Sequence, residues 1–474
     1  MKQIVLNKDN SSVEFLYEQL YKDIKNQILS GDMIGGEKCP SLRMLSENLG
    51  VSITTVMESY NQLLAEGYIK NKPGSGYFVE KLNSDLMKNA HFESIYDDEK
   101  DAELDGTSPY LYDEEAFDFI KWKKCASKVF VDNTHELLFG SDLRGEYSLR
   151  DEISKYLFQS RGVKASPQNI IIAAGTQQIA FHLGRILKKR GIDLVSVEKP
   201  GYAPVKSMFE DAGFKSFDIP VLENGIDILK LPVNISSAVY VNPSNQFPTG
   251  VVMPAGIRYE ILKWADENDS FIIEDDYNSE LRYIGKPLPT IKSLDKSDRV
   301  VYLGSFSSTL FSAIKISYMV LPKELSEIFD GLKKNYSQTC SKAEQLTLAE
   351  YMKEGYYYTA IRKKRALFTK KLAKVEEIFE KYNSDNASAK KRDKLKIQIA
   401  NKNSGLFITV RVTTQIDGAI LTEVAKALRV MTSYIDEISD NNEKYLSVYY
   451  SYIPLESIEK IMESLLTEWN KIEE

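Results

Sequence analysis

Phosphate binding is the first chemistry that the residue spacing suggests. The apolar run from Asn169 to Ala174 has the character of a buried strand and leads directly into Gly175, Thr176 and Gln177, which open an amphipathic segment. A strand followed at once by a helix would place backbone amides and the Thr176 hydroxyl at a helix N-terminus, where the helix dipole favours a phosphate. Taken alone, this pattern is a weak signal.

Further strand-like runs end in residues that suit an aromatic ligand. Tyr202 follows Pro200-Gly201 and could stack on a planar ring, and Asp275 supplies the carboxylate that a pyridinium nitrogen requires. The other candidates near strand ends are Asn242, Tyr277, Ser305, Ser307, Ser308 and Lys315. Because open α/β sheets bind ligands outside the carboxyl ends of their strands, we predict one cofactor site there. Core packing of Tyr202, helix capping by Asp275 and turn roles for the serines stay open as alternatives.

The elements that must position these residues begin with a small N-terminal domain. Apolar residues at helical spacing run from Phe15 to Ser30-Gly31, and two shorter helices follow, capped by Ser41 and Ser52. Residues 67–79 then alternate around a Pro-Gly-Ser-Gly turn, as the two strands of a wing would. A winged helix-turn-helix lays its second short helix in the major groove of DNA. The predicted DNA-binding residues are Ser41, Arg43, Ser52, Thr54, Thr55, Lys70, Lys72, Gly74 and Ser75.

Three zones follow one another along the chain. Residues 1–80 form the predicted DNA-binding domain, residues 81–113 an acidic linker with few aliphatic side chains, and residues 114–474 a large domain. Strand-like runs at 169–174, 193–197, 238–241, 271–273 and 300–303 alternate with amphipathic segments in that large domain. Short continuous apolar runs are typical of strands covered on both faces, so we predict an α/β domain on a mostly parallel sheet.

The composition excludes several classes of protein. The chain has 474 residues, 43% of them hydrophobic, which is enough for a large core and rules out general disorder. Its net charge is −7, and residues 1–80 hold eight Lys and Arg against ten Asp and Glu, so any DNA contact must be local. Three widely spaced cysteines, no signal-peptide pattern and no long apolar run predict a cytoplasmic protein without a metal site or a membrane contact.

Two known families are similar to the two ends of this chain. Leu16-Tyr17-Glu18-Gln19, Pro40-Ser41-Leu42-Arg43 and Pro73-Gly74-Ser75-Gly76 resemble the GntR family of bacterial repressors. The strand-end residues, in their order and spacing, resemble aminotransferase class I, pyridoxal phosphate fold type I. Such a fusion resembles the MocR subfamily of bacterial transcription regulators. The resemblance implies an N-terminal winged helix-turn-helix and an α/β aminotransferase fold type I with a smaller C-terminal α/β subdomain. It also implies a head-to-tail homodimer, pyridoxal 5'-phosphate as cofactor and a DNA operator as partner.

The same resemblance assigns a role to most residues of the cofactor site. The phosphate would be held by Gly175, Thr176, Gln177, Ser305 and Ser307. Tyr202 would stack on the pyridine ring, Asp275 would pair with its nitrogen and Tyr277 would meet its phenolic oxygen. Lys315 stands where the family usually has a phosphate-binding arginine.

Ser308 departs from the family pattern. The family motif reads Ser-Phe-Ser-Lys, and its lysine binds the cofactor covalently, whereas Ser308 stands at that position here. A serine hydroxyl cannot form an imine, so we predict that the chain is not an enzyme. Two explanations stay open: a natural regulator that senses without chemistry, or an engineered replacement of the lysine. Lys315 is the only nearby alternative amine in the sequence.

Three functions compete on this evidence. We favour a transcription regulator that senses pyridoxal phosphate, or its adduct with an amine or amino acid. An aminotransferase with an accessory DNA-binding domain and a scaffold with two vestigial sites are the alternatives. Effectors in the resembled subfamily include the cofactor, γ-aminobutyrate, taurine and a D-alanyl dipeptide, and Arg282 and Lys206 are candidates for holding an amino-acid carboxylate. GntR-type recognition helices commonly carry two arginines at places where Ile53 and Glu58 stand here.

Overall fold

The computed structural model describes residues 4, 6, 15–81, 113–281, 288–332, 335–388, 395–403 and 405–472. The chain divides into two units, Met1–Gly106 and Thr107–Glu474. All but the first and last residues of the linker predicted at 81–113 lie outside the described residues.

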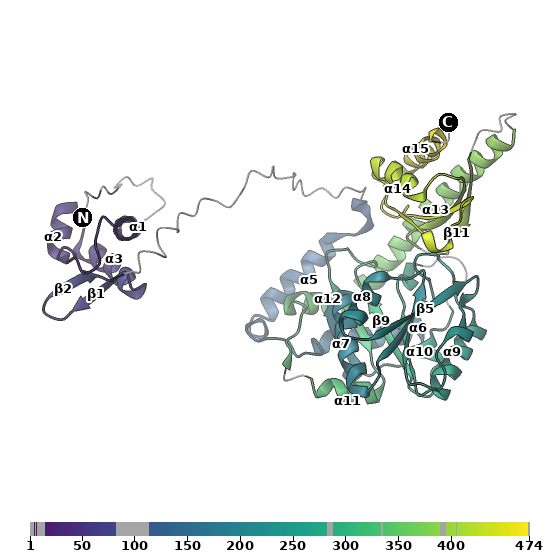
Figure 1. Ribbon diagram of the computed structural model, residues 1–474, viewed down its shortest axis with the longest axis horizontal. Helices are drawn as coiled ribbons and strands as arrows, with labels where there is room; N and C mark the ends of the chain where they lie inside the picture. Colours follow the sequence, from purple (N-terminus) through teal and green to yellow (C-terminus); the bar gives the residue numbers. More distant parts are fainter. Residues whose placement is uncertain are drawn as a thin grey trace. The chain divides into compact units, whose positions relative to one another are not determined.

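The first unit is a winged helix-turn-helix. Helices α1 (Leu16–Leu29), α2 (Leu42–Leu49) and α3 (Ile53–Ala65) precede the antiparallel strands β1 (Ile69–Lys72) and β2 (Gly76–Val79) (Figure 1). The helices bury one apolar stripe each around a common core, which includes Leu20, Ile24, Leu45, Val56 and Leu63. The wing predicted from residues 67–79 is confirmed as this hairpin.

Local capping explains where the two short helices begin. The Ser41 hydroxyl accepts a hydrogen bond from the Met44 amide at 3.3 Å, and the Ser52 hydroxyl accepts one from the Thr55 amide at 3.0 Å. Gly50 ends α2 with a φ of 60°, a left-handed conformation that glycine adopts without steric cost. The turn from Gly50 to Ser52 therefore fixes the angle between α2 and α3.

An eight-stranded sheet forms the centre of the second unit. Its strand order is β3 (Ile170–Ala174), β10 (Ile316–Val320), β9 (Val300–Ser305), β8 (Phe271–Asp275), β7 (Ala238–Val241), β4 (Leu194–Lys199), β5 (Lys215–Leu222) and β6 (Gly225–Ile226). The strands from β9 to β5 are parallel, while β10 is antiparallel to both of its neighbours. The predicted strand runs are confirmed, and β3, β4, β7, β8 and β9 all end at one edge of the sheet.

Helices cover both faces of this sheet. One face packs on α7 (Gly175–Arg190), α8 (Ala203–Asp211) and α11 (Lys323–Asp330). The other packs on α6 (Tyr147–Arg161), α9 (Ala255–Glu267), α10 (Ile291–Leu294) and α12 (Lys342–Lys353), with α5 (Phe119–Asp132) against α12. Successive residues of β3 alternate between the two cores, as strand geometry requires: Ile170 and Ile172 face one core and Ile171 and Ala173 the other.

A smaller C-terminal subdomain follows the long helix α13 (Tyr356–Ser388). Its antiparallel sheet has the order β11 (Lys396–Asn401), β12 (Ile408–Thr413), β14 (Glu443–Val448) and β13 (Thr432–Tyr434), and it packs on α13, α14 (Gly418–Ala427) and α15 (Ile458–Lys471) (Figure 1). Short 3-10 turns lie at Glu114–Ala116, Glu136–Leu138, Pro167–Asn169, Ile228–Lys230, Ser279–Leu281 and Asp436–Ile438. The predicted fold class is confirmed. Among the described helices, none is long and apolar enough to cross a membrane.

Candidate functional site

The candidate phosphate-binding residues lie where β3 passes into α7. Gly175 begins α7 with a φ of 84°, and the N-cap residue Ala174 makes no side-chain capping bond. The antiparallel register pairs Ile316 with Ala174, which places the exposed Lys315 at the level of Gly175. The first turn of α7, with Thr176 and the exposed Gln177, therefore offers backbone amides that suit an anion, and Lys315 lies at the same level of the neighbouring strand.

Two serine hydroxyls complete this end of the site. The Ser317 hydroxyl donates to the Ser305 hydroxyl at 3.0 Å, and the Ser307 hydroxyl donates to the Ile314 carbonyl at 2.7 Å. Ser305 ends β9, and β10 separates β9 from β3, so these hydroxyls lie one strand away from Lys315 and two from the start of α7. The sheet order thus gathers residues that are up to 140 positions apart in the sequence.

Asp275 lies at the end of β8 with a partner that the sequence analysis did not identify. The hydroxyl of Tyr240, on β7, donates a hydrogen bond to the Asp275 carboxylate, and the Asn242 side chain donates to the Asp275 backbone carbonyl at 3.1 Å. Burial raises the pKa of Asp275 to about 6, against the lowering effect of the Tyr240 hydrogen bond. A cation beside Asp275 would favour its ionised form.

A second buried acid lies behind Asp275. The Glu198 carboxylate accepts hydrogen bonds from the Asn242 amide and the Gln246 side chain, both at 3.2 Å. Burial raises the pKa of Glu198 to about 8, so at neutral pH this carboxyl is mostly protonated while Asp275 is mostly ionised. The Asn242 side-chain oxygen is buried without a hydrogen-bond partner in the described part of the chain, as a ligand-facing acceptor would be.

Aromatic rings lie beside these acids. Tyr202 follows a cis Lys199–Pro200 bond, is half-exposed, and meets Phe247 edge to face at 6.0 Å between ring centroids. Phe247 also contacts Phe407, with 6.3 Å between the ring centroids. This contact brings the C-terminal subdomain against the site. Tyr277 belongs to the same apolar cluster. Burial raises the pKa of Tyr277 well above its usual value.

The adjacent residue, Asp276, forms a buried ion pair with Arg161. The Arg161 guanidinium, at the end of α6, donates to both Asp276 carboxylate oxygens at 2.7 and 2.9 Å, and Tyr302 donates at 2.6 Å. Burial works to raise the pKa of Asp276, but the charge of Arg161 and the hydrogen bonds from its neighbours together outweigh burial, and the pKa is lowered. The neighbouring carboxylates Asp275 and Asp276 therefore differ: the first lies at the candidate ligand site and the second fastens α6 to β8.

Ser308 lies in the turn after β9, half-buried and without an amine. The Lys364 ammonium, on α13, donates to the Ser308 carbonyl at 3.1 Å and to the Leu310 carbonyl at 2.7 Å. Burial lowers the pKa of Lys364 to about 8. This lysine is committed to two backbone carbonyls, and it was not identified from the sequence because it lies 56 residues from Ser308.

The candidate carboxylate-binding residues have different outcomes. The Lys206 ammonium is 2.6 Å from the Asp218 carboxylate, so it is engaged by an acid of the same chain. Arg282 lies outside the described residues.

In the winged helix, most predicted DNA-binding residues are exposed. Arg43, Thr54, Lys70, Lys72, Gly74 and Ser75 are exposed and Thr55 is half-buried. The Ser41 and Ser52 hydroxyls accept capping hydrogen bonds, so their first role is to begin α2 and α3. Lys70 pairs with Glu80 at 2.7 Å, and the Lys72 ammonium lies over the Phe78 ring at 4.6 Å. Arg43 and the wing turn are thus the more available phosphate contacts.

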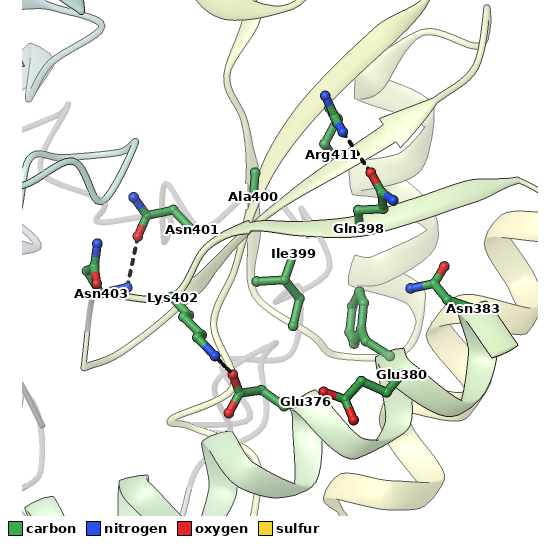
Figure 2. Close-up of a pocket in the computed structure, with 11 residues that line it drawn as sticks. Glu376, Glu380, Asn383, Gln398, Ile399, Ala400, Asn401, Lys402, Asn403 and Arg411 are labelled. Carbon is green, nitrogen blue, oxygen red and sulfur yellow. Dashed lines mark hydrogen bonds and ion pairs between the residues drawn. The ribbon is translucent and has the colours of Figure 1, made fainter. Parts of the chain in front are cut away.

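A polar cleft of about 600 Å³ lies in the C-terminal subdomain. Figure 2 shows Glu376, Glu380 and Asn383 of α13 facing strand β11 across this cleft. Two of its charged groups, Lys402 and Glu376, form an ion pair, and Arg411 donates a hydrogen bond to Gln398 at 2.7 Å. None of the predicted cofactor-binding residues lines it.

Comparison with known proteins gives matches to both units. Residues 16–79 match the family of bacterial regulatory proteins of the gntR type, and residues 106–430 match aminotransferase class I and II. The uncharacterized HTH-type transcriptional regulator YdeL of Bacillus subtilis is 36% identical, over 87% of each chain. The probable rhizopine catabolism regulatory protein MocR of Rhizobium meliloti is 29% identical, over 87% of this chain and 84% of the relative. A kynurenine aminotransferase of Pyrococcus horikoshii, solved with PMP, superposes with a TM-score of 0.62 at 24% identity, over 78% of this chain and 93% of the enzyme.

Proposed function

We propose a function for this chain from the premise that it belongs to the MocR subfamily of GntR-type transcription regulators, which join a DNA-binding winged helix to an aminotransferase-like domain. It is a cytoplasmic regulator that binds an operator through α3 and the wing. Its large unit senses pyridoxal 5'-phosphate, or an adduct of this cofactor with an amine or amino acid. It does not catalyse amino-group transfer.

The residues present fit the cofactor. The uncapped start of α7, Lys315 and the hydroxyls of Ser305 and Ser307 suit a phosphate, and Asp275 suits a protonated ring nitrogen. The unpartnered buried oxygen of Asn242 supports a polar ligand group beside it. When bound, pyridoxal phosphate supplies an aldehyde that condenses with amines and a ring that withdraws electrons.

Different residues of the chain would bind different parts of the cofactor. Tyr202 would stack on the ring, and the Tyr240 hydroxyl, which donates to the Asp275 carboxylate, would orient that carboxylate for the ring nitrogen. Glu198, kept neutral by burial, adds no second negative charge at pH 7. The site therefore presents one carboxylate to the cationic ring and one ammonium group to the phosphate.

The single observation that carries the proposal is this intact binding set around Ser308. With a lysine at that position the chain would be expected to bind the cofactor covalently, but serine has no amine. The side chain opposite, Lys364, is held by the carbonyls of Ser308 and Leu310. Binding without a covalent bond leaves the cofactor exchangeable, which is what a sensor of its concentration requires.

Homodimerisation is part of the proposal. Exposed apolar side chains gather on α5 and the segment after it: Ile120, Phe130, Val131, Leu138 and Phe139. Exposed apolar side chains of this kind are candidates for an interface. A second copy of the chain is the partner that the family favours, and two winged helices would then read two half-sites.

Native mass spectrometry tests the cofactor proposal. We expect one pyridoxal phosphate per chain in the intact protein, lost when the ions are activated and absent after dialysis. The matched variant Asp275→Ala should bind the cofactor at least tenfold more weakly. Failure of the unmodified protein to bind pyridoxal phosphate, alone or with amines, would refute the sensor.

A further inference from the structure

Helix α3 exposes apolar side chains that its own core does not need. Its buried stripe consists of Val56, Ser59, Tyr60 and Leu63. On the other side, Ile53 is 47% exposed and Met57 is 38% exposed. These two residues are four positions apart, so they lie one above the other on the same face of the helix.

The same face carries no positive charge. Arg and Lys are absent from the whole of α3, from Ile53 to Ala65. The other exposed residues of the helix are Thr54, Glu58, Asn61, Gln62 and Ala65. Guanine offers two acceptors, O6 and N7, in the major groove, and an arginine or lysine is the side chain that most often reads them. This helix has no such donor.

One feature of the base edges matches an apolar face. The C5-methyl of thymine is the apolar group that an A·T pair presents in the major groove. The N-terminal residues of a recognition helix are those that contact base edges, and Ile53 is the first residue of α3, with Met57 one turn later. We propose that α3 recognises thymine methyl groups in its operator through Ile53 and Met57. This inference rests on DNA binding by the winged helix but not on cofactor sensing.

The domain has no excess of positive charge, so the apolar contact contributes a larger share of its sequence specificity. Residues 1–80 carry eight Lys and Arg against ten Asp and Glu, and two of those cations, Lys25 and Lys70, are paired with Glu66 and Glu80. Non-specific affinity for DNA comes from phosphate neutralisation, which is small for such a surface. Burial of methyl groups on the bases depends on sequence and does not need charge. Apolar readout therefore contributes a larger share of specificity here than in a basic domain.

The test removes the methyl groups from the DNA. The full-length protein first selects operators from a random duplex library, and each thymine of the selected site is then replaced by deoxyuridine, one at a time. Binding is measured by fluorescence anisotropy at fixed salt. We expect a three- to fivefold loss at one or two positions of each half-site, about the effect of burying one methyl group.

Protein variants assign the methyl contacts to residues. Ile53→Ala and Met57→Ala should each weaken binding to the thymine operator three- to fivefold or more, and should abolish the deoxyuridine effect at one position. Ile34→Ala, an equally apolar truncation at a 70% exposed residue outside α2 and α3, is the control and should change neither value. Circular dichroism and the melting temperature establish that each variant is folded.

Three outcomes would overturn the inference. Selected operators that bind equally well with deoxyuridine at every position would contradict methyl readout while leaving DNA binding intact. A loss of dimer mass in Ile53→Ala or Met57→Ala would show that a second copy covers this face instead. Failure to select any sequence would contradict DNA binding itself, and the inference with it.

Discussion

The proposal that this chain senses its ligand without amino-group transfer depends on the identity of one side chain, Ser308. The proposed cofactor-binding groups lie at one edge of the eight-stranded sheet, and Ser308 among them has no amine with which to form an imine. Two lysines concern this turn in the described part of the chain: Lys364 is bound to the carbonyls of Ser308 and Leu310, and the exposed Lys315 lies at the level of Gly175.

The variant Ser308→Lys should bind pyridoxal phosphate covalently. A lysine at this position would supply an amine beside the proposed cofactor site, where Asp275 and the start of α7 would hold the cofactor. After borohydride reduction, peptide mass spectrometry should locate the cofactor on Lys at position 308 in the variant and nowhere in the unmodified chain. A stable adduct on Lys315 or Lys364 of the unmodified chain would contradict this expectation.

Cofactor affinity should depend on pH through Asp275. Burial raises the pKa of this carboxyl to about 6, so the free protein holds the proton below that pH, and only the ionised form can pair with a cationic ring. Affinity should therefore fall as pH decreases through 6, by up to about tenfold per unit, and a competing proton should be released on binding. Titrations between pH 5 and 8 measure this.

Two substitutions identify the group responsible. Asp275→Asn should weaken binding and remove the step near pH 6. Tyr240→Phe removes a hydrogen bond that lowers the pKa of Asp275, so the midpoint should move to higher pH. An unchanged step in Asp275→Asn would assign the titration to another group, of which Glu198 is the nearest.

At the scale of elements, a buried ion pair fastens a helix to the sheet. Arg161 ends α6 and Asp276 follows β8, and both side chains are almost fully buried. Ser244 and Ser279 add hydrogen bonds to the pair. Since Asp276 follows Asp275 directly, this anchor also positions the residue that would meet the ring nitrogen.

Removal of only one charge of the ion pair should lower the stability of the large unit. Asp276→Asn leaves the Arg161 charge buried without its counter-charge, and we expect a loss of about 3–5 kcal/mol in the stability of the large unit. The double variant Arg161→Met/Asp276→Leu removes both charges and should lose less than Asp276→Asn. Chemical denaturation followed by tryptophan fluorescence gives these values. Equal losses in the single and double variants would show that the polar network, not the unpaired charge, sets the cost.

Helix α13 contacts both the turn that contains Ser308 and the residue Asp113, near the start of the large unit. Lys364 holds the Ser308 carbonyl, and Lys371, two turns later, forms a buried ion pair with Asp113 and donates to the Ser451 carbonyl at 2.7 Å. Asp113 is the first described residue after the segment that follows the winged helix. A ligand can change DNA affinity only if it binds one arrangement better than another, and the two effects must be reciprocal.

The variant Lys364→Met should weaken this coupling. We expect pyridoxal phosphate to shift operator affinity of the unmodified protein by about 5- to 150-fold, and operator DNA to shift cofactor affinity equally. Lys364→Met should reduce both shifts with little change in operator affinity of the ligand-free protein, whereas Lys363→Met, at the exposed neighbour, should reduce neither. Arg43→Ala should weaken DNA binding alone. If Lys364→Met leaves both shifts intact, coupling does not pass through α13.

Assembly can be tested by light scattering. The protein should have twice the mass of its 53.9 kDa chain at micromolar concentration. Val131→Glu combined with Leu138→Glu places charge on the exposed apolar region and should give a monomer, because a buried unpaired carboxylate opposes association. A monomer in the unmodified protein would contradict the dimer.

The features that depend only on neighbouring residues could be predicted from the amino-acid sequence. The caps at Ser41 and Ser52, the glycine at position 50 and the alternation of the wing are local, so the winged helix could be predicted element by element. The strand ends could be predicted as well, because continuous apolar runs stop at polar residues. The absence of an amine at Ser308 needed no structure at all.

Which side chains contact one another depends on the tertiary structure and could not be predicted from the sequence. Arg161 reaches Asp276 over 115 positions, Lys364 reaches Ser308 over 56, and Tyr240 reaches Asp275 across adjacent strands. These contacts depend on the order of strands in the sheet and on the path of α13, which local periodicity does not specify. The same holds for the different protonation of Glu198 and Asp275, because burial and partners set a pKa, and both come from elements far away in the sequence.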